Sequence, residues 1–327
     1  MTTPLPIRAL VDPPRRELAR YGLLSAAHVI DGPNPHQYNG VEYDYTCTNM
    51  VQPYRMPQEA GCDDDGRWIT PDKVASPGPD LIQASPFALY TAWSCGLEID
   101  WSETERRLRD RLDFGEEHRV EQVIETGSLG NRPALTQNTA VLDTTGDLSV
   151  KDAEAVLAHW IDATFGSLGV VHVPRYAYAR IEGLLQHPAD GGHWYEDSLG
   201  NRIALGSGYV GSAPAGHEDD GALWLYGTGP VTVRRSAVIQ PASVDSPAGS
   251  STLRLHAGQN DPGRPAYDNF MLVERIYVVD WPCQAAAVKT SMRRPVVEPE
   301  QDDELRAEWH PVPDDPMAID LTVSRQE

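Results

Sequence analysis

Apolar residues recur with a helical period in the middle of the chain, where two helices are predicted. The first follows Ser102-Glu103-Thr104-Glu105, a capping box with Ser102 as the N-cap. Its apolar positions predict a helix from Glu103 to about Thr126 that ends at Gly127, namely Leu108, Leu112, Val120, Val123 and Ile124. The remaining positions are mostly charged. This pattern favours a spine of roughly 35 Å that lies across a sheet over a fully buried core helix.

The region after this helix predicts a mixed body of helices and strands. A second helix is expected from Ser149 to Phe165, ended by Gly166, and a buried strand over Gly169–Val173. Pro174 suits the first turn of a third helix, which reaches Leu185. Further strands are predicted over residues 202–205, 223–226, 231–239, 271–280 and 285–288.

Both ends of the chain and one internal stretch lack the apolar content of a core. Residues 1–30 predict an arm with a short helix near Arg15–Ala27, and residues 291–327 hold ten acids, four arginines and five prolines. Residues 31–80 are rich in Gly and Pro, with alternating segments at Val41–Thr46 and Arg67–Thr70. We therefore expect extended hairpin strands there that need partners to become ordered.

The charge of the chain narrows the classes of function. It has 48 acidic against 27 basic residues and a formal net charge of −21, which opposes a broad basic face for nucleic acid or anionic membrane. Only three of the basic residues are lysine, and the rest are arginine. This excess of arginine can reflect a bias toward GC-rich codons, and it also suits bidentate ion pairs across protein interfaces. No run approaches the ~18 apolar residues of a membrane helix. Met1–Leu10 shows no signal-peptide pattern. A cytoplasmic product is expected.

The four cysteines lie far apart and show neither zinc-ligand spacing nor a disulfide framework. We interpret them as buried free thiols, at Cys47, Cys62, Cys95 and Cys283.

Three segments could carry chemistry, and for each a structural interpretation is favoured. Gly206–Gly211 matches G-x-G-x-x-G after a strand, but a loop with three acids follows where a phosphate-binding helix is required, so a turn is predicted. His217–Asp220 and Cys62–Asp65 lack the spacing of a calcium loop and predict solvated acidic turns. His172 is expected as a hydrogen-bonded core residue. No catalytic, cofactor-binding or metal-binding residues are therefore assigned, and no enzyme is predicted.

The order of the parts and two segments carry a resemblance to a known family. Glu274–Val288 resembles a pair of C-terminal strands separated by a turn, of which the first contains Arg and the second is rich in Ala. Leu223–Val231 resembles segments of structural proteins of actinobacterial phages. Over residues 1–290 the chain resembles the major capsid proteins of tailed double-stranded DNA bacteriophages, whose Hong Kong-type fold encapsulins share. The acidic tail is no usual part of that pattern.

The resemblance implies an α+β fold with six parts. These are an N-terminal arm (1–30), an extended E-loop (31–80), a spine helix with part of a P-domain (81–148), an A-domain-like α/β body (149–270), returning P-domain strands (271–290) and an acidic Pro-rich tail (291–327).

The function implied is that of a shell protein that assembles with itself into hexamers and pentamers of an icosahedral head. Such a head forms in the host cytoplasm, encloses DNA without specific binding, and uses scaffold and portal proteins as partners. No cofactor and no membrane partner are expected. The alternatives are an encapsulin-type compartment shell, a phage tail or decoration protein, and a soluble α/β enzyme. Residues 106–121 and 31–80 are predicted to contact neighbouring subunits, so Arg111→Glu or a deletion within 41–70 should abolish assembly.

Overall fold

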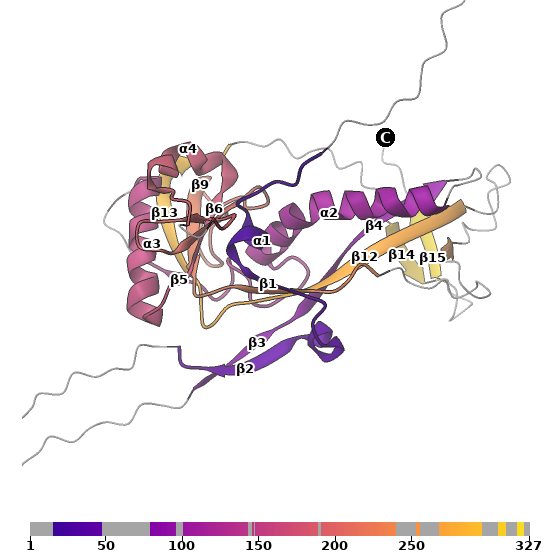
Figure 1. Ribbon diagram of the computed structural model, residues 1–327, viewed down its shortest axis with the longest axis horizontal. Coiled ribbons are helices and arrows are strands. Elements are labelled where there is room, and N and C mark those ends of the chain that lie inside the picture. Colours follow the sequence, from indigo (N-terminus) through magenta and orange to yellow (C-terminus); the bar gives the residue numbers. More distant parts are fainter. Residues whose placement is uncertain are drawn as a thin grey trace, which may run out of the picture.

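The protein is an α+β molecule, as the sequence predicts. The computed structural model describes residues 16–47, 79–95, 101–142, 146, 148–188, 191–239, 253–255, 268–295, 307–311 and 319–323. Two larger sheets organise these residues, and helix α2 (Trp101–Thr126) runs along one of them (Figure 1).

The body is built around a six-stranded sheet with the order β5-β13-β9-β6-β8-β7. Its strands are β5 (Ala140–Val141), β6 (Val170–Pro174), β7 (Tyr195–Glu196), β8 (Arg202–Gly206), β9 (Ala222–Thr228) and β13 (Ala286–Arg293). Every residue of β6 and β9 is buried, which explains why these strands read as continuous apolar runs. Helix α3 (Val150–Phe165) packs on the sheet through Leu157 and Ile161.

A second sheet carries α2 and extends away from the body (Figure 1). Its long central strand β12 (Asp268–Asp280) pairs with β4 (Pro86–Cys95) along one edge. Along the other edge lie β10 (Thr232–Arg235) and β11 (Leu253–Leu255), and β1 (His28–Asp31) adds to β10 in parallel. Helix α2 packs on β4 and β12. The helix therefore lies across a sheet, as its charged pattern predicts.

Two hairpins form sheets of their own. Strands β2 (Val41–Tyr45) and β3 (Asp80–Ala84) pair antiparallel, as do β14 (Ala307–Pro311) and β15 (Ile319–Val323). In Figure 1, β2 and β3 lie to one side of β12, apart from α2. The strand predicted over Val41–Thr46 is confirmed, whereas the segment at Arg67–Thr70 lies outside the described residues.

The helix ends follow the sequence signals in most places. Ser149 accepts a hydrogen bond from the backbone N–H of Asp152 and caps α3, and Gly166 ends it with a φ of 59°. Gly127, with a φ of 65°, follows the last residue of α2. Helix α2 begins at Trp101, so Ser102 lies inside the helix and the predicted N-cap position is wrong by two residues.

Two predicted helices are much shorter in the structure. In the described part of Arg15–Ala27 only α1 (Leu23–Ala26) is helical, because Tyr21 adopts a φ of 71° that ends any continuous helix before it. The helix predicted from Pro174 to Leu185 is a series of single turns: η2 (Arg175–Ala177), α4 (Tyr178–Ile181) and η3 (Glu182–Leu184). The strand predicted over 231–239 is regular only in β10, and η1 (Pro35–Asn39) is a turn the sequence analysis does not predict.

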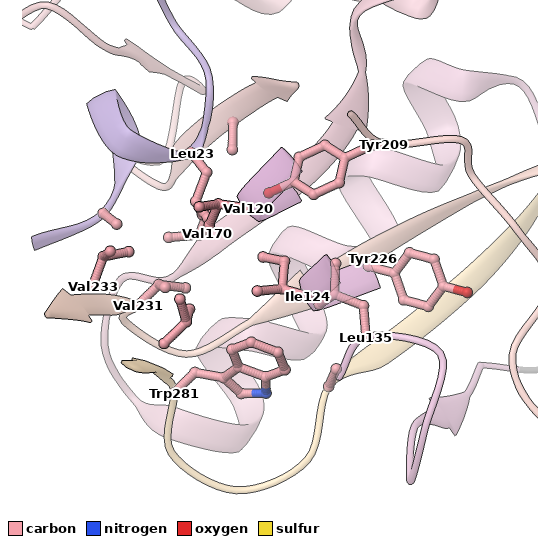
Figure 2. Close-up of a cluster of buried hydrophobic side chains, with 14 of the residues drawn as sticks. Leu23, Val120, Ile124, Leu135, Val170, Tyr209, Tyr226, Val231, Val233 and Trp281 are labelled. Atoms are coloured by element: carbon pink, nitrogen blue, oxygen red, sulfur yellow. The ribbon is translucent and has the colours of Figure 1, made fainter. Parts of the chain in front are cut away.

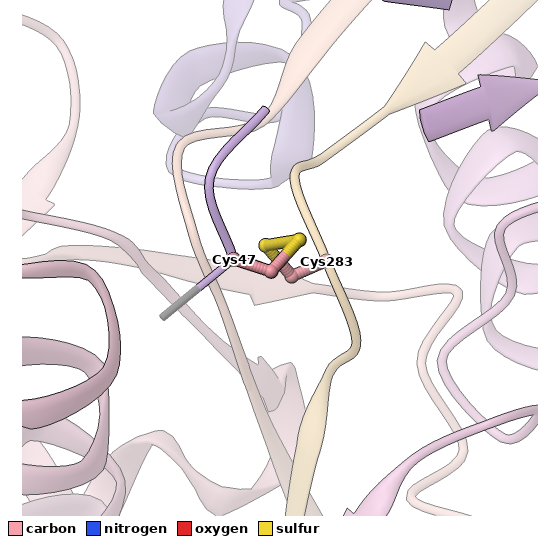
Figure 3. The surroundings of a disulfide bond; sticks show 2 residues. All are labelled: Cys47 and Cys283. Atoms are coloured by element: carbon pink, nitrogen blue, oxygen red, sulfur yellow. A yellow bond between two sulfur atoms is a disulfide. The ribbon is translucent and has the colours of Figure 1, made fainter. Parts of the chain in front are cut away.

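The prediction of free thiols is wrong for two of the four cysteines. Cys47 follows β2, Cys283 lies between β12 and β13, and the two form a disulfide with a Cα–Cα distance of 5.4 Å (Figure 3). They are 236 residues apart, so their spacing in the sequence holds no sign of the pairing. The bond ties the hairpin to the turn that connects the two sheets. Cys62 lies outside the described residues.

Candidate assembly interfaces around helix α2

Helix α2 joins the two halves of the molecule through its apolar stripe. Near its start, Leu108 and Leu112 pack with Met271 and Val273 of β12. Near its end, Val120 and Ile124 enter the larger core, shown in Figure 2 with Leu23, Leu135, Val170, Tyr226 and Trp281. One stripe thus fixes the helix both on the sheet and on the body.

A buried carboxylate in the middle of α2 fixes the helix to two strands directly and to a third through Arg235. Glu116 accepts hydrogen bonds from Arg235 of β10 at 2.5 Å and from Arg275 and Tyr277 of β12, the latter at 2.7 Å. Arg235 also pairs with Asp31 of β1 at 2.5 Å. The Glu116 side chain is only 7% exposed, so removing its charge would leave two guanidinium groups without a counter-charge in a poorly solvated site.

Three further carboxylates, which we call the carboxylate ladder, follow on one face of α2 at intervals of four residues: Glu117, Glu121 and Glu125. They accept hydrogen bonds from backbone N–H groups of two other segments. Glu117 accepts from Leu24 at 3.0 Å, and Glu121 from both Leu23 and Gly208 at 2.9 Å. The ladder therefore connects the arm before β1 with the loop after β8.

The last carboxylate of the ladder extends this link along the same loop. Glu125 accepts from the N–H groups of Val210 at 2.6 Å and Ser212 at 2.8 Å. The ladder forms no salt bridge to any residue that the structure describes, although Arg175 and Arg294 act on it from a greater distance. Its charges are thus balanced by backbone dipoles more than by ions.

Burial disfavours the ionised form of the three carboxyl groups of the ladder. Desolvation, and next the charge of Glu117, raise the pKa of Glu121 to about 7, while the N–H groups of Gly208 and Leu23 and the charge of Arg175 oppose this. Desolvation also raises the pKa of Glu117 and of Glu125. A proton on this face of the helix therefore exchanges near neutral pH.

The glycine-rich motif has a structural role at this ladder. Its loop donates to Glu121 and Glu125, so the N–H groups that would hold a phosphate in a dinucleotide site are taken by the protein's own carboxylates. A Cβ on Gly208 would lie 1.9 Å from the carbonyl oxygen of His118, so only glycine permits this approach to α2. The predicted loop is confirmed, and its packing partner is a finding of the structure.

The acidic turn at His217–Asp220 is held by ion pairs. Asp220 pairs with Lys289 at 2.7 Å, and Asp219 pairs with Arg294. Within the described part of the chain no group of three or more His, Cys, Asp or Glu side chains could hold a metal ion. The other acidic segment, Cys62–Asp65, lies outside it. The turn at Asp219 and Asp220 thus fastens β13 and the residues that follow it.

His172 is a core histidine, as predicted. Its ring nitrogens lie 2.9 Å from the hydroxyl of Tyr209 and 3.0 Å from that of Thr228. Desolvation lowers the pKa of His172 to about 3, so the ring stays neutral. It has no access to solvent for proton transfer and acts in packing.

The hairpin β2–β3 makes few contacts with the body. The Tyr43 hydroxyl hydrogen bonds to Asp280 at the end of β12, and Asp280 pairs with Arg234 of β10. The disulfide of Cys47 ties the end of β2 from which the connecting segment leaves to the turn after β12 (Figure 3). Leu81 is 56% exposed, and β2 alternates between exposed and half-buried residues. Its strands pair with no strand of the larger sheets in the described residues.

The described helices include none that is both long and apolar enough to cross a membrane. No model of a protein family and no curated protein matches the chain.

Solved structures similar to this chain include shells of two kinds. A chain of the capsid of a native GTA particle is 14% identical, with a TM-score of 0.47, 86% of this chain covered and 96% of that one. A chain of Gordonia phage Cozz is 9% identical, with a TM-score of 0.48 and coverage of 88% and 92%. The SrpI encapsulin of Synechococcus elongatus PCC 7942 is 10% identical, with a TM-score of 0.48 and coverage of 86% and 91%.

Proposed function

We propose that this chain is the shell protein of a phage head with the Hong Kong-type capsid fold, and that it has structural and no catalytic roles. One observation carries the proposal, namely a two-stranded hairpin that lies apart from the core and pairs with no strand of the larger sheets in the described residues. Its described links to the body beyond the chain itself include the disulfide of Cys47, which follows β2, and the contact of Tyr43 with Asp280. An isolated two-stranded hairpin is marginal in water, so it needs a partner surface. Neighbouring copies in a shell supply such a surface at every position.

The parts of the fold are assigned on this basis. Residues 1–30 form the N-terminal arm and 31–80 the extended loop. The spine helix and part of the P-domain follow at 81–148, the A-domain at 149–270, the returning strands at 271–290 and the tail at 291–327. In this assignment β3 forms the second side of the extended loop, because it pairs with β2 along its whole length.

The partners are other copies of the chain, in hexamers and pentamers that close an icosahedral head, with separate scaffold and portal proteins. The head encloses DNA without specific binding, since a net charge of −21 repels the phosphate backbone from the wall. This places the mature protein in the virion, after assembly in the host cytoplasm.

Electron microscopy of negatively stained particles, together with size-exclusion chromatography, tests the proposal. Closed shells or capsomers of five and six copies are expected. A stable monomer or dimer at every concentration would contradict it. A shell that assembles without other phage proteins and encloses an enzyme would instead indicate an encapsulin-type compartment.

Arg111→Glu tests the contact proposed for α2. Arg111 is exposed and forms no ion pair with the described residues, so its reversal leaves the fold intact and should abolish assembly if this face meets a neighbour. Arg180→Glu, on the exposed side of α4, is the matched control and should assemble normally. Normal particles from Arg111→Glu would show that this face of α2 lies outside the interface.

A further inference from the structure

The disulfide between Cys47 and Cys283 fastens the end of the hairpin β2–β3 that lies away from its connection to β4. At the connected end Val41 pairs with Ala84, and one residue later the chain enters β4. Cys47 lies beyond the opposite end of β2, two residues after Tyr45, and its Cα is 5.4 Å from that of Cys283 (Figure 3). The bond therefore holds the far end of the hairpin on the turn after β12.

Without this bond, the described hairpin has few contacts that hold it on the body. The Tyr43 hydroxyl hydrogen bonds to Asp280, and β3 contacts β12, but Glu42 and Asp44 are exposed. Before β2, Gly40 adopts a φ of 114°, which lets the chain change direction there. A two-stranded hairpin is marginal in water on its own. Opening the bond therefore allows the far end of the hairpin to move away from the turn.

Both cysteines can be reached by small thiols and disulfides, because each is only half-buried. Cys283 also adopts a φ of 65°, a left-handed conformation that few residues other than glycine take. Accessible disulfides at strained positions are typically those that exchange with their surroundings. The pair thus has the properties of a bond that forms and opens with the redox conditions.

The position of the redox equilibrium depends on how firmly the fold holds the two sulfur atoms together. A loosely held hairpin presents one thiol to the other at a modest effective concentration. Such a pair stays reduced where small thiols are in excess, as in the cytosol, and is oxidised where small disulfides are in excess. The same chain therefore has two states of the hairpin, one for each environment.

We propose that Cys47 and Cys283 form a redox switch. As a dithiol it leaves the hairpin β2–β3 able to move about its connection to β4, and as a disulfide it fixes the hairpin on the turn after β12. The reaction is exchange with a small-molecule disulfide: the thiolate of one cysteine attacks it and releases one small thiolate, and the thiolate of the other cysteine then displaces the second. The pair loses two electrons and two protons, and the small disulfide becomes two thiols.

This proposal deepens the proposed function and rests on it for the order of events. Subunits assemble as dithiols in the host cytoplasm, where the hairpin can adjust to a neighbouring copy. Oxidation after release from the cell then fixes the hairpin in the finished shell.

Equilibration in glutathione buffers tests the switch on unassembled subunits of the full chain. Cys62→Ser combined with Cys95→Ser leaves only the pair, and the unchanged chain is the control. After N-ethylmaleimide has blocked the thiols, mass spectrometry measures the ratio of linked to unlinked peptides of Cys47 and Cys283. This ratio should fall at least about tenfold between an excess of oxidised and a cytosol-like excess of reduced glutathione. A pair that stays linked, or stays unlinked, in both buffers overturns the proposal.

Hydrogen exchange, read by mass spectrometry, measures the effect of the switch on the hairpin. Amides of β2 and β3 should exchange about tenfold faster in the dithiol than in the disulfide, while β6 and β9 stay protected over the same exposure time. Cys47→Ser should show the fast exchange in both buffers, and Cys62→Ser should respond as the unchanged chain does. Equal exchange of the hairpin in the two states overturns the proposal. Because both measurements use subunits, a chain that switches and forms no shells would contradict the proposed function and support the switch.

Discussion

The six-stranded sheet and the hairpin β2–β3 are both built from short strands, yet they are stabilised in different ways. All residues of β6 and β9 are buried, and α3 covers the sheet with apolar side chains. The hairpin has two strands, half-exposed side chains and one disulfide, at Cys47 directly after β2. The sheet is therefore stabilised by its own core, whereas the hairpin has few contacts within the described subunit, and in the proposed shell neighbouring copies supply the rest.

Deleting residues 41–70 gives the largest expected effect, because it removes β2 and the proposed contacts with neighbours. Assembly should be lost entirely. The body should keep its far-ultraviolet circular dichroism and a cooperative urea transition, at a lower urea concentration because the disulfide of Cys47 is removed with the segment. The body keeps its fold because its core residues in α3, β6 and β9 make no use of this segment. Particles of normal size from the deleted chain would refute the role given to the hairpin.

Cys47→Ser tests how strongly the hairpin is coupled to the body. The disulfide closes a loop of 236 residues, for which the chain-entropy account gives a loss of about 5.5 kcal/mol in the free energy of unfolding on removal. Urea unfolding of the oxidised protein and of the variant measures it. A reductant should destabilise the unchanged protein and leave the variant as it is. Equal stability of both proteins without reductant would show that the bond does not form.

Glu116→Gln tests the link between α2 and the second sheet. The change leaves Arg235 and Arg275 without their carboxylate, and breaking such a buried pair costs about 3 kcal/mol. Urea unfolding at neutral pH measures the loss. Glu103→Gln, half-exposed in the first turn of the same helix, is the matched control and should show no measurable change. A loss equal to that of the control would mean that the three-strand cluster contributes little.

Elements with a periodic apolar pattern, and helix ends marked by glycine, could be predicted from the sequence. Contacts between segments far apart in the sequence could not. The stripe from Leu108 to Ile124 defines α2, and Gly127 and Gly166 mark helix ends by the backbone they permit. The single helix predicted after Pro174 is wrong because the spacing of Tyr178, Ile181 and Leu184 is helical, whereas tertiary contacts decide that the segment forms separate short turns.

The two features that matter most for the proposed interfaces depend on such distant contacts. The pairing of Cys47 with Cys283 arises only when β2 and the turn after β12 meet. Likewise Glu121 reads as one more charge of a solvated helix, and only the approach of Gly208 and Leu23 buries it. A signal was present in the i, i+4 spacing of the three glutamates, which is unfavourable on a helix surface unless each has a partner.

The smallest expected effect concerns the carboxylate ladder, which joins the arm and the body. In the folded protein the pKa of Glu121 is raised from 4.5 to about 7, by burial first and by the charge of Glu117 next. The folded state therefore binds this proton more tightly than the unfolded chain does. The associated stability is present below pH 4.5 and is lost as the pH rises through 7, with a decrease of about 2.5 kcal/mol between pH 5 and pH 8.

Glu121→Gln, which carries no charge at any pH, should remove most of this dependence. The groups that face Glu121 also include Arg175 and Tyr209, and burial raises the pKa of Tyr209 well above its usual value, so the Tyr209 hydroxyl stays neutral between pH 5 and pH 8. Urea unfolding at pH 5, 6.5 and 8 measures the slope. Glu103→Gln should retain the slope of the unchanged protein, since Arg106 and Arg107 hold the pKa of Glu103 at about 2. If the free energy of unfolding of Glu121→Gln still falls with pH as in the unchanged protein, the titrating group is Glu117 or Glu125. Glu121 would then not be the residue that links the contact between the arm and the loop to a proton.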